Sequence, residues 1–231
     1  MTTQTNYGDG TGNPASGPVR YPAIPTPIGG GESNPTPESV KKLETERLAV
    51  ATLALSQQGE DYLKGWEGSK STPDGQKLFY YDDDSDYCTV GWGHLVNGRQ
   101  SCAALGIKGF PKRYNYKMGD ENRFQWISAD KAQEIFKQDV RQKAEDLIKK
   151  DVKVPLFQHE FDALCVLAFN VGRLSVVAPK LMKLLNQGDY ANAPNEIMDI
   201  NKSNGVIMPG LNLRRKRDYD IFSKQIYNWS H

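Results

Sequence analysis

Glu67 is the first residue whose type and position suit acid chemistry. It follows Trp66 and precedes Gly68 at the end of a stretch with helical periodicity, so we expect its carboxylate to project into a gap between a helix and a sheet. An indole beside a carboxyl excludes water and favours the protonated form, which a general acid needs at neutral pH. An isolated glutamate at a helix end is usually solvent-exposed, so this assignment depends on partner residues elsewhere in the chain.

A carboxylate and a hydroxyl that suit the binding of one water come next. Asp83 lies in the acidic run 82–86, and Thr89 follows after five intervening residues. If Asp83 and Thr89 lie on the two sides of one hairpin, they could hold a single water between them. An inverting glycosidase requires such a water on the face of its sugar substrate opposite the general acid. A retaining enzyme needs its two carboxyls about 5 Å apart, and the sequence leaves this choice open. A solvated acidic turn is the simpler interpretation of the aspartates taken alone.

Metal binding is a weaker interpretation of the same acidic run. A calcium loop that begins at Asp82 requires glycine at its sixth position and glutamate at its twelfth. The chain has Tyr87 and Gly93 there. The three histidines and three cysteines show none of the usual zinc-ligand spacings. We therefore expect no metal and no other cofactor.

The spacing of apolar residues predicts the elements that position these groups. Helical periodicity runs over residues 40–66, with Gly59 as a break. Aromatic and β-branched residues at 78–81 and 87–96 flank the acidic run and predict an antiparallel hairpin. Further helices are expected at 128–150, capped by Ser128, and at 158–171, 179–187, 191–201 and 213–227. The fold class is α+β, mainly helical with a small antiparallel hairpin or sheet lobe.

Composition divides the 231-residue chain into an extension and a folded part. Residues 1–37 contain seven of the 13 prolines and seven of the 21 glycines. Such a segment cannot contribute to a packed core. We expect a flexible Pro/Gly-rich extension over residues 1–40 and one catalytic domain over residues 41–231. The extension is interpreted either as a solvated tail or as a peptide that docks on a carrier or delivery protein.

Charge and cysteine content restrict the partners. Residues 47–107 carry 5 basic and 8 acidic side chains, and residues 108–231 carry 21 and 15. A mildly basic body suits an anionic polymer and is too weak a bias to indicate nucleic-acid binding. Cys165 lies in an apolar run and is expected to be buried, and we favour free thiols for Cys88 and Cys102 over a disulfide. No segment has the length of a membrane span, and no secretory signal is visible.

The order of these motifs resembles the phage-type lysozymes, which are the endolysins of glycoside hydrolase family 24. The resemblance begins with Glu67-Gly68, Asp83 and residues 89–94 (Thr-Val-Gly-Trp-Gly-His). It continues through residues 158–172 of the expected central helix and through residues 181–190 and 210–215. Together these segments cover most of residues 50–225, and the resemblance implies a lysozyme-like fold.

The resemblance also implies an activity and a catalytic set. A member of this family is expected to be a muramidase that cleaves the β-1,4 bond between N-acetylmuramic acid and N-acetylglucosamine in peptidoglycan. Glu67 would protonate the leaving oxygen. Asp83 and Thr89 would orient the water or stabilise the oxocarbenium-like transition state.

Other motif positions imply substrate contacts and supporting roles. Leu95, Phe169 and Asn170 match positions that face the glycan cleft. His94 is expected to be fixed by hydrogen bonds under the sheet rather than to shuttle protons. Arg214, with Arg215, is expected either to meet substrate carboxylates or to form a structural ion pair.

Two departures from the family pattern affect the assignments. Residues 70–77 form an apparent insertion between Glu67 and Asp83, so that Asp82 or Asp84 competes with Asp83 for its role. The spacing to Thr89 favours Asp83. A substrate-contacting serine of many members is replaced here by Pro179 and the lysine that follows.

The biological setting leaves several alternatives open. We expect a monomer that is made in the cytoplasm without a signal peptide and acts on the cell wall or periplasm after holin-mediated release or injection. Those routes correspond to a phage endolysin, a tail-associated lysin or a delivered antibacterial effector, and we expect neither membrane nor nucleic-acid partners. The alternative functions are a lytic transglycosylase and a catalytically inactive glycan-binding or virion structural module.

Overall fold

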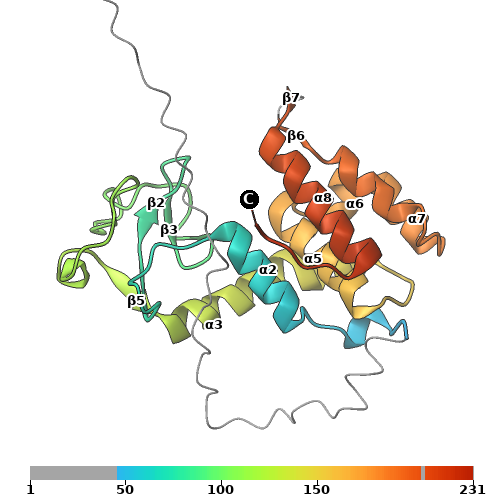
Figure 1. Ribbon diagram of the computed structural model, residues 1–231, viewed down its shortest axis with the longest axis horizontal. Helices are drawn as coiled ribbons and strands as arrows, with labels where there is room; N and C mark the ends of the chain where they lie inside the picture. The colour runs from blue at the N-terminus through green and yellow to red at the C-terminus, as the bar shows by residue number, and fades with distance from the viewer. Residues whose placement is uncertain (1–45, 204–205, 231) are drawn as a thin grey trace, which may run out of the picture.

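Helices form about half of the described chain, and a small antiparallel β lobe lies beside them (Figure 1). The structure is a computed structural model that describes residues 46–203 and 206–230. This architecture confirms the predicted α+β class. The expected extension over residues 1–40 and the start of the expected helix at 40–66 lie outside the described residues. Within residues 46–203 and 206–230, no helix is long and apolar enough to cross a membrane.

The first long helix, α2 (Gln57–Glu67), begins later than the periodicity predicted. A short 3-10 turn, η1 (Val50–Thr52), and an extended segment precede it. The helix begins at Gln57 because the Ser56 side chain accepts a hydrogen bond from Gly59 N and caps the first turn. Gly59 is therefore part of the helix and not a break, which corrects the prediction. Glu67 is the last helical residue, as expected, and Gly68 ends the helix with φ of 63°.

The β lobe contains a three-stranded sheet in the order β2-β3-β4 and a separate β1–β5 pair. Its strands are β1 (Lys77–Phe79), β2 (Tyr81–Asp82), β3 (Cys88–Val90), β4 (His94–Leu95) and β5 (Trp126–Ser128). The predicted hairpin across the acidic run is confirmed, with Tyr81 opposite Thr89. The single strand expected over residues 87–96 is wrong, because Gly91 and Gly93 adopt φ of 63° and 78° and turn the chain between β3 and β4. The β1–β5 pairing was not predicted.

A disulfide joins Cys88 of β3 to Cys102, whose Cα lies 4.5 Å from that of Cys88. Our preference for free thiols at these positions is therefore wrong. The chain after β4 folds back beside β3, where Cys88 N donates to Gln100 O at 2.7 Å. Cys102 N donates to Asp82 Oδ1 at 2.7 Å. The third cysteine, Cys165, is buried as expected.

The helical lobe follows the predicted order closely. Ser128 caps the helix that follows it by accepting a hydrogen bond from Lys131 N at 3.2 Å. The predicted helix at 128–150 contains a π-helical turn, and the segment expected as a helix at 191–201 is a 3-10 helix. The elements are α3 (Ala129–Val140), η3 (Arg141–Glu145), α4 (Asp146–Asp151), α5 (Gln158–Val171), α6 (Leu174–Val177), α7 (Pro179–Asn186), η4 (Ala193–Asp199), β6 (Lys202–Ser203), β7 (Val206–Ile207) and α8 (Pro209–Lys224).

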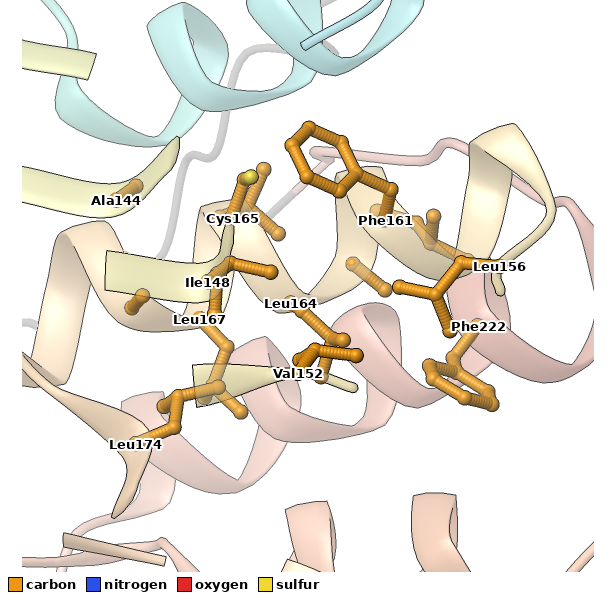
Figure 2. Close-up of a cluster of buried hydrophobic side chains, with 14 of the residues drawn as sticks. Ala144, Ile148, Val152, Leu156, Phe161, Leu164, Cys165, Leu167, Leu174 and Phe222 are labelled. Carbon is orange, nitrogen blue, oxygen red and sulfur yellow. The ribbon is translucent and has the colours of Figure 1, made fainter. Parts of the chain in front are cut away.

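Helix α5 is the centre of the core. Every residue from Glu160 to Ala168 is buried, because the helix is apolar on most faces and is covered by its neighbours. Figure 2 shows Leu164 and Leu167 of α5 beside Ile148 of α4, with Phe222 of α8 in the same cluster. Each such side chain contributes about 1.5–3 kcal/mol by leaving water. This packing fixes α8 against α5.

The segment after α8 returns across α2 (Figure 1). A Cβ atom added to Gly65 would lie 2.3 Å from Trp229 Cδ1, so the indole occupies the space that a side chain at position 65 would need. The Tyr227 hydroxyl donates to Asp162 Oδ2 of α5 at 2.7 Å. The C-terminal segment thereby holds the last turns of α2 against the helical lobe.

Removing the Cys88–Cys102 disulfide tests how much it stabilises the fold around β3. The double variant Cys88→Ser/Cys102→Ser is expected to lose about 3 kcal/mol of unfolding free energy, because the cross-link closes a loop of 14 residues in the unfolded chain. Urea denaturation measures the loss. Reducing agent should lower the stability of the wild type to that of the variant and leave the variant unchanged. A variant as stable as the oxidised wild type would contradict the pairing.

Candidate active site

Glu67 is held at the end of α2 by an ion pair with α8. Arg214 Nη2 donates to Glu67 Oε1 at 2.8 Å, and the two side chains are 10% and 21% exposed. The other oxygen, Oε2, lies against the turn between β3 and β4, where a Cβ atom on Gly93 would be 3.2 Å away. Glycine at position 93 permits both this close approach and the positive φ of the turn. The α2 carboxylate therefore reaches the β lobe.

An indole flanks this ion pair. The Arg214 guanidinium carbon lies 5.5 Å from the centroid of the Trp66 ring. The sequence indicated Trp66 as the residue that excludes water from Glu67, and the structure adds a cation in direct contact with the carboxylate. In a partly dehydrated site such a hydrogen-bonded charge pair is stronger than it would be in water. Of the two alternatives for Arg214, the structure contains the ion pair.

Asp83 closes the β2–β3 turn with one of its two oxygens. Asp83 Oδ1 accepts hydrogen bonds from Ser85 N at 2.8 Å and from Tyr87 N at 2.9 Å. Within the described residues, Oδ2 accepts none. Thr89 is buried on β3, and its hydroxyl donates to Tyr87 O at 3.1 Å. The backbone contacts thus fix both side chains and leave the Thr89 oxygen with acceptor capacity.

Tyr81 lies within the electrostatic influence of both Glu67 and Asp83. It was not among the site residues predicted from the sequence. It lies half-buried on β2 opposite Thr89. Burial raises the pKa of Tyr81 to about 12, with further contributions from the negative charges of Glu67 and Asp83. One phenol therefore senses both carboxylates and stays protonated at neutral pH. The only signal in the sequence was an aromatic residue just before the acidic run.

The other aspartates of the run have different surroundings. Asp82 belongs to β2 and accepts the hydrogen bond from Cys102 N. Asp82, Cys88 and Cys102 are the group of possible metal ligands found in the described part of the chain, but the disulfide uses both thiols. Asp84 is exposed at the turn. Asp82 and Asp83 both accept hydrogen bonds from the backbone, Asp82 from Cys102 N and Asp83 from within its own turn, so the choice of Asp83 stays a prediction.

His94 joins the β lobe to the helices. Its Nδ1 lies 3.0 Å from Asp139 Oδ2, and Lys143 Nζ donates to the same carboxylate oxygen at 2.8 Å. These contacts tie β4 to the end of α3. They supply the hydrogen bond expected to fix His94, and its role stays a prediction.

The expected substrate contacts come from both lobes. Leu95 is 40% exposed on β4, where it pairs with Thr89. Phe169, near the end of α5, is half-buried with Lys143 Nζ 5.3 Å from its ring centroid. Asn170 is exposed at the next position of α5. Its side-chain oxygen accepts a hydrogen bond from Arg215 of α8.

A buried polar chain underlies Asn170. Arg215 and Asp218 of α8 are both fully buried, with Arg215 Nη1 3.4 Å from Asp218 Oδ2. The Tyr62 hydroxyl of α2 donates to Asp218 Oδ1 at 2.8 Å. Burial raises the pKa of Asp218, and the charge of Arg215 opposes this change. Arg215 cannot meet a substrate carboxylate from this position. Consecutive arginines of α8 instead contact Glu67 and Asn170.

The chain belongs to the phage lysozyme family, whose sequence model matches residues 71–218. The matched range includes Asp83, Thr89 and Asn170 and begins after Glu67, so the geometry at Arg214 and Gly93 is an independent argument for Glu67. The family membership explains the mixed fold of a helical lobe and a small sheet.

Individual relatives give the extent of the similarity. The chain is 30% identical over 170 residues to the endolysin of Bacillus phage B103, covering 74% of this chain and 54% of that endolysin. It therefore spans about half the length of that relative. It is 34% identical over 134 residues to the endolysin of Acyrthosiphon pisum secondary endosymbiont phage 1, covering 56% and 88% of the two chains. The solved endolysin of Escherichia coli O157:H7 phage FAHEc1 superposes with a TM-score of 0.57 at 25% identity, covering 77% of this chain and 98% of that one.

The buried polar contacts of Arg215, Asp218 and Tyr62 predict that loss of the Tyr62 hydroxyl lowers stability more than loss of the Tyr190 hydroxyl. Tyr62→Phe removes a donor to the buried Asp218 carboxylate and is expected to lower the free energy of unfolding by about 1–3 kcal/mol. Tyr190→Phe is the matched control, because its hydroxyl donates to Pro155 O at an exposed site. Urea denaturation of both variants checks the difference. Equal losses would show that the Tyr62 hydroxyl has no special role.

Proposed function

We propose that this protein is an N-acetylmuramidase that hydrolyses the β-1,4 bond between N-acetylmuramic acid and N-acetylglucosamine in peptidoglycan. The observation that carries the proposal is the position of Glu67. Its carboxylate is anchored by Arg214 on one side and lies against the Gly93 turn on the other. Membership of the phage lysozyme family supports the same activity.

Glu67 is the general acid of the proposed reaction. Arg214 holds Oε1, so Oε2 is the oxygen that delivers the proton to the glycosidic oxygen. Once the proton has left, the Arg214 guanidinium stabilises the remaining carboxylate. Fixing one carboxylate oxygen also limits rotation of the group, which positions the acid before substrate binds.

Asp83 and Thr89 direct the water. Asp83 Oδ2 is the carboxylate oxygen that the turn leaves without a protein donor, and it accepts a proton from the attacking water. The Thr89 oxygen accepts a hydrogen bond from the second O–H of the water, which stays on the product as the new hydroxyl, because the Thr89 proton is already donated to Tyr87 O. The negative charge of Asp83 also stabilises the oxocarbenium-like transition state. Tyr81 remains a neutral phenol within range of the charges of both carboxylates.

The remaining residues position the glycan. Asn170 offers an amide whose orientation is set by Arg215. Leu95 from the β lobe and Phe169 from the helical lobe give the cleft apolar sides. A lytic transglycosylase needs one acid and no water, so Asp83 and Thr89, together in the turn and strand of one hairpin, favour hydrolysis over this alternative.

We also propose a division of the chain and a site of action. Residues 41–231 form the catalytic domain, and residues 1–40 are an extension outside it, either a solvated tail or a peptide that docks on a carrier or delivery protein. The relatives carry the name endolysin, which supports action on the cell wall after release during lysis. The basic charge of residues 108–231 suits an anionic wall.

Replacing the acid tests the proposal. Glu67→Gln keeps an oxygen for Arg214 but cannot donate an acidic proton, so the lysis rate is expected to fall about 100-fold or more. Loss of turbidity of a purified peptidoglycan suspension measures the rate. The matched control is Glu134→Gln, because Glu134 is 68% exposed on α3, and its rate should equal that of the wild type. Full lysis by a folded Glu67→Gln protein would sink the proposal.

A further inference from the structure

A second surface of the β lobe has the composition of a binding site. A hollow of about 450 Å³ lies there, and its lining includes Tyr80, Lys108, Asn122, Gln125 and Trp126. Its volume is within the range of small-ligand sites, about 300–1,000 Å³. None of the residues proposed for catalysis lines it.

The hollow and the proposed catalytic residues lie on opposite sides of the extended segment at Tyr80 and Tyr81. Tyr80 and Tyr81 are consecutive, and successive side chains of an extended segment point to opposite faces. Tyr81 senses the charges of Glu67 and Asp83, whereas Tyr80 lines the hollow. Hydrogen bonds from Tyr80 N to Gln125 O at 3.0 Å and from Phe110 N to Tyr80 O at 2.6 Å keep this segment extended. A ligand in the hollow would therefore leave the catalytic cleft open.

Trp126 of β5 offers a fixed aromatic surface. It is 38% exposed, so part of the ring is available to a ligand. Its Nε1 donates to Glu121 O at 3.0 Å, which sets the plane of the ring. Lys77 Nζ lies 4.6 Å from the ring centroid, but Lys77 is not part of the lining of this hollow. The ring is thus held in one orientation beside the hollow.

The polar groups around the ring divide into two kinds. The charged side chains Glu121 and Arg123 already have partners in the protein. Glu121 accepts a hydrogen bond from the Tyr116 hydroxyl, and Arg123 donates one to Asp120. By contrast, the Lys108 ammonium and the Asn122 amide have no hydrogen-bond partner among the described residues. The groups left free are those that bind sugar hydroxyl, acetamido and carboxylate groups.

We propose that this hollow is a second binding site for peptidoglycan, separate from the cleft, and this inference rests on the proposed function. A sugar ring of the glycan stacks on Trp126. The Asn122 amide and the Gln125 Nε2 group bond its hydroxyl and acetamido groups, since Gln125 Oε1 already accepts from Lys108 N at 2.8 Å. The Lys108 ammonium pairs with a carboxylate of the stem peptide. Because the site and the cleft lie on opposite sides of that extended segment, the strand held here is a neighbour of the strand that is cut.

A neighbouring hollow extends this surface along the β lobe. It has a volume of about 680 Å³, shares Lys108, Arg123 and Phe124 with the first, and reaches Asp82 and Asp86 at the catalytic hairpin. A polymer that occupies the first hollow therefore has room to continue. Binding here would keep the enzyme on the wall between cleavage events.

The first experiment measures binding without cleavage. Glu67→Gln protein is mixed with purified peptidoglycan sacculi, and the bound fraction is determined after sedimentation. Adding Lys108→Ala and Asn122→Ala is expected to weaken binding about fivefold to tenfold, as is adding Trp126→Ala. The matched control adds Lys183→Ala and Asn195→Ala, which remove the same groups from exposed positions of the helical lobe. Equal binding by the Lys108/Asn122 variant and this control would overturn the proposal.

The second experiment separates this site from the catalytic one. In the active enzyme, Lys108→Ala/Asn122→Ala should slow the digestion of sacculi and leave the rate on short soluble peptidoglycan fragments unchanged. Equal slowing on both substrates would place the effect in the cleft and contradict a second site. The binding measurement in the Glu67→Gln background needs no turnover. It therefore still tests the second site if the proposed hydrolysis fails.

Discussion

The ion pair between Arg214 and Glu67 joins two elements that are 147 positions apart in the chain. Partly burying the two charges costs solvation free energy. The attraction between them offsets this cost only when the geometry of the pair is good. That geometry depends on α8 staying against α5, where the apolar cluster around Phe222 holds it. The Glu67 carboxylate, the proposed acid, is therefore positioned by the packing of the helical lobe. The C-terminal segment adds to this by packing Trp229 on α2.

The β lobe has the complementary task of bringing a turn to the acid. Because Gly93 has no side chain, the turn between β3 and β4 can approach Glu67 closely. The backbone contacts of Asp83 shape the neighbouring hairpin. The disulfide from Cys88 holds the strand that carries Thr89. His94 then fastens this lobe to α3 through Asp139. The two lobes thus contribute opposite sides of one proposed site.

Local patterns in the sequence predicted much of this arrangement. Periodicity gave α5 its bounds, and the Ser128 cap located the start of α3. The order of Glu67, Asp83 and Thr89 indicated the candidate site, because these residues lie in one contiguous stretch of chain. Contacts between distant segments were not predictable in this way: the Cys88–Cys102 pairing, the β1–β5 pair and the burial of Arg215 all depend on how the chain folds back. The late start of α2 was missed because apolar spacing continues through residues that a cap at Ser56 excludes from the helix.

The reaction proposed for this site is hydrolysis, in which water attacks the glycan while an acid protonates the leaving oxygen. Digestion of peptidoglycan in water enriched in heavy oxygen, followed by mass spectrometry of the released fragments, tests it most directly. The account predicts reducing muramic acid ends that carry one heavy oxygen atom. Anhydro-muramic ends without the label would contradict it, because they form when no water enters the reaction.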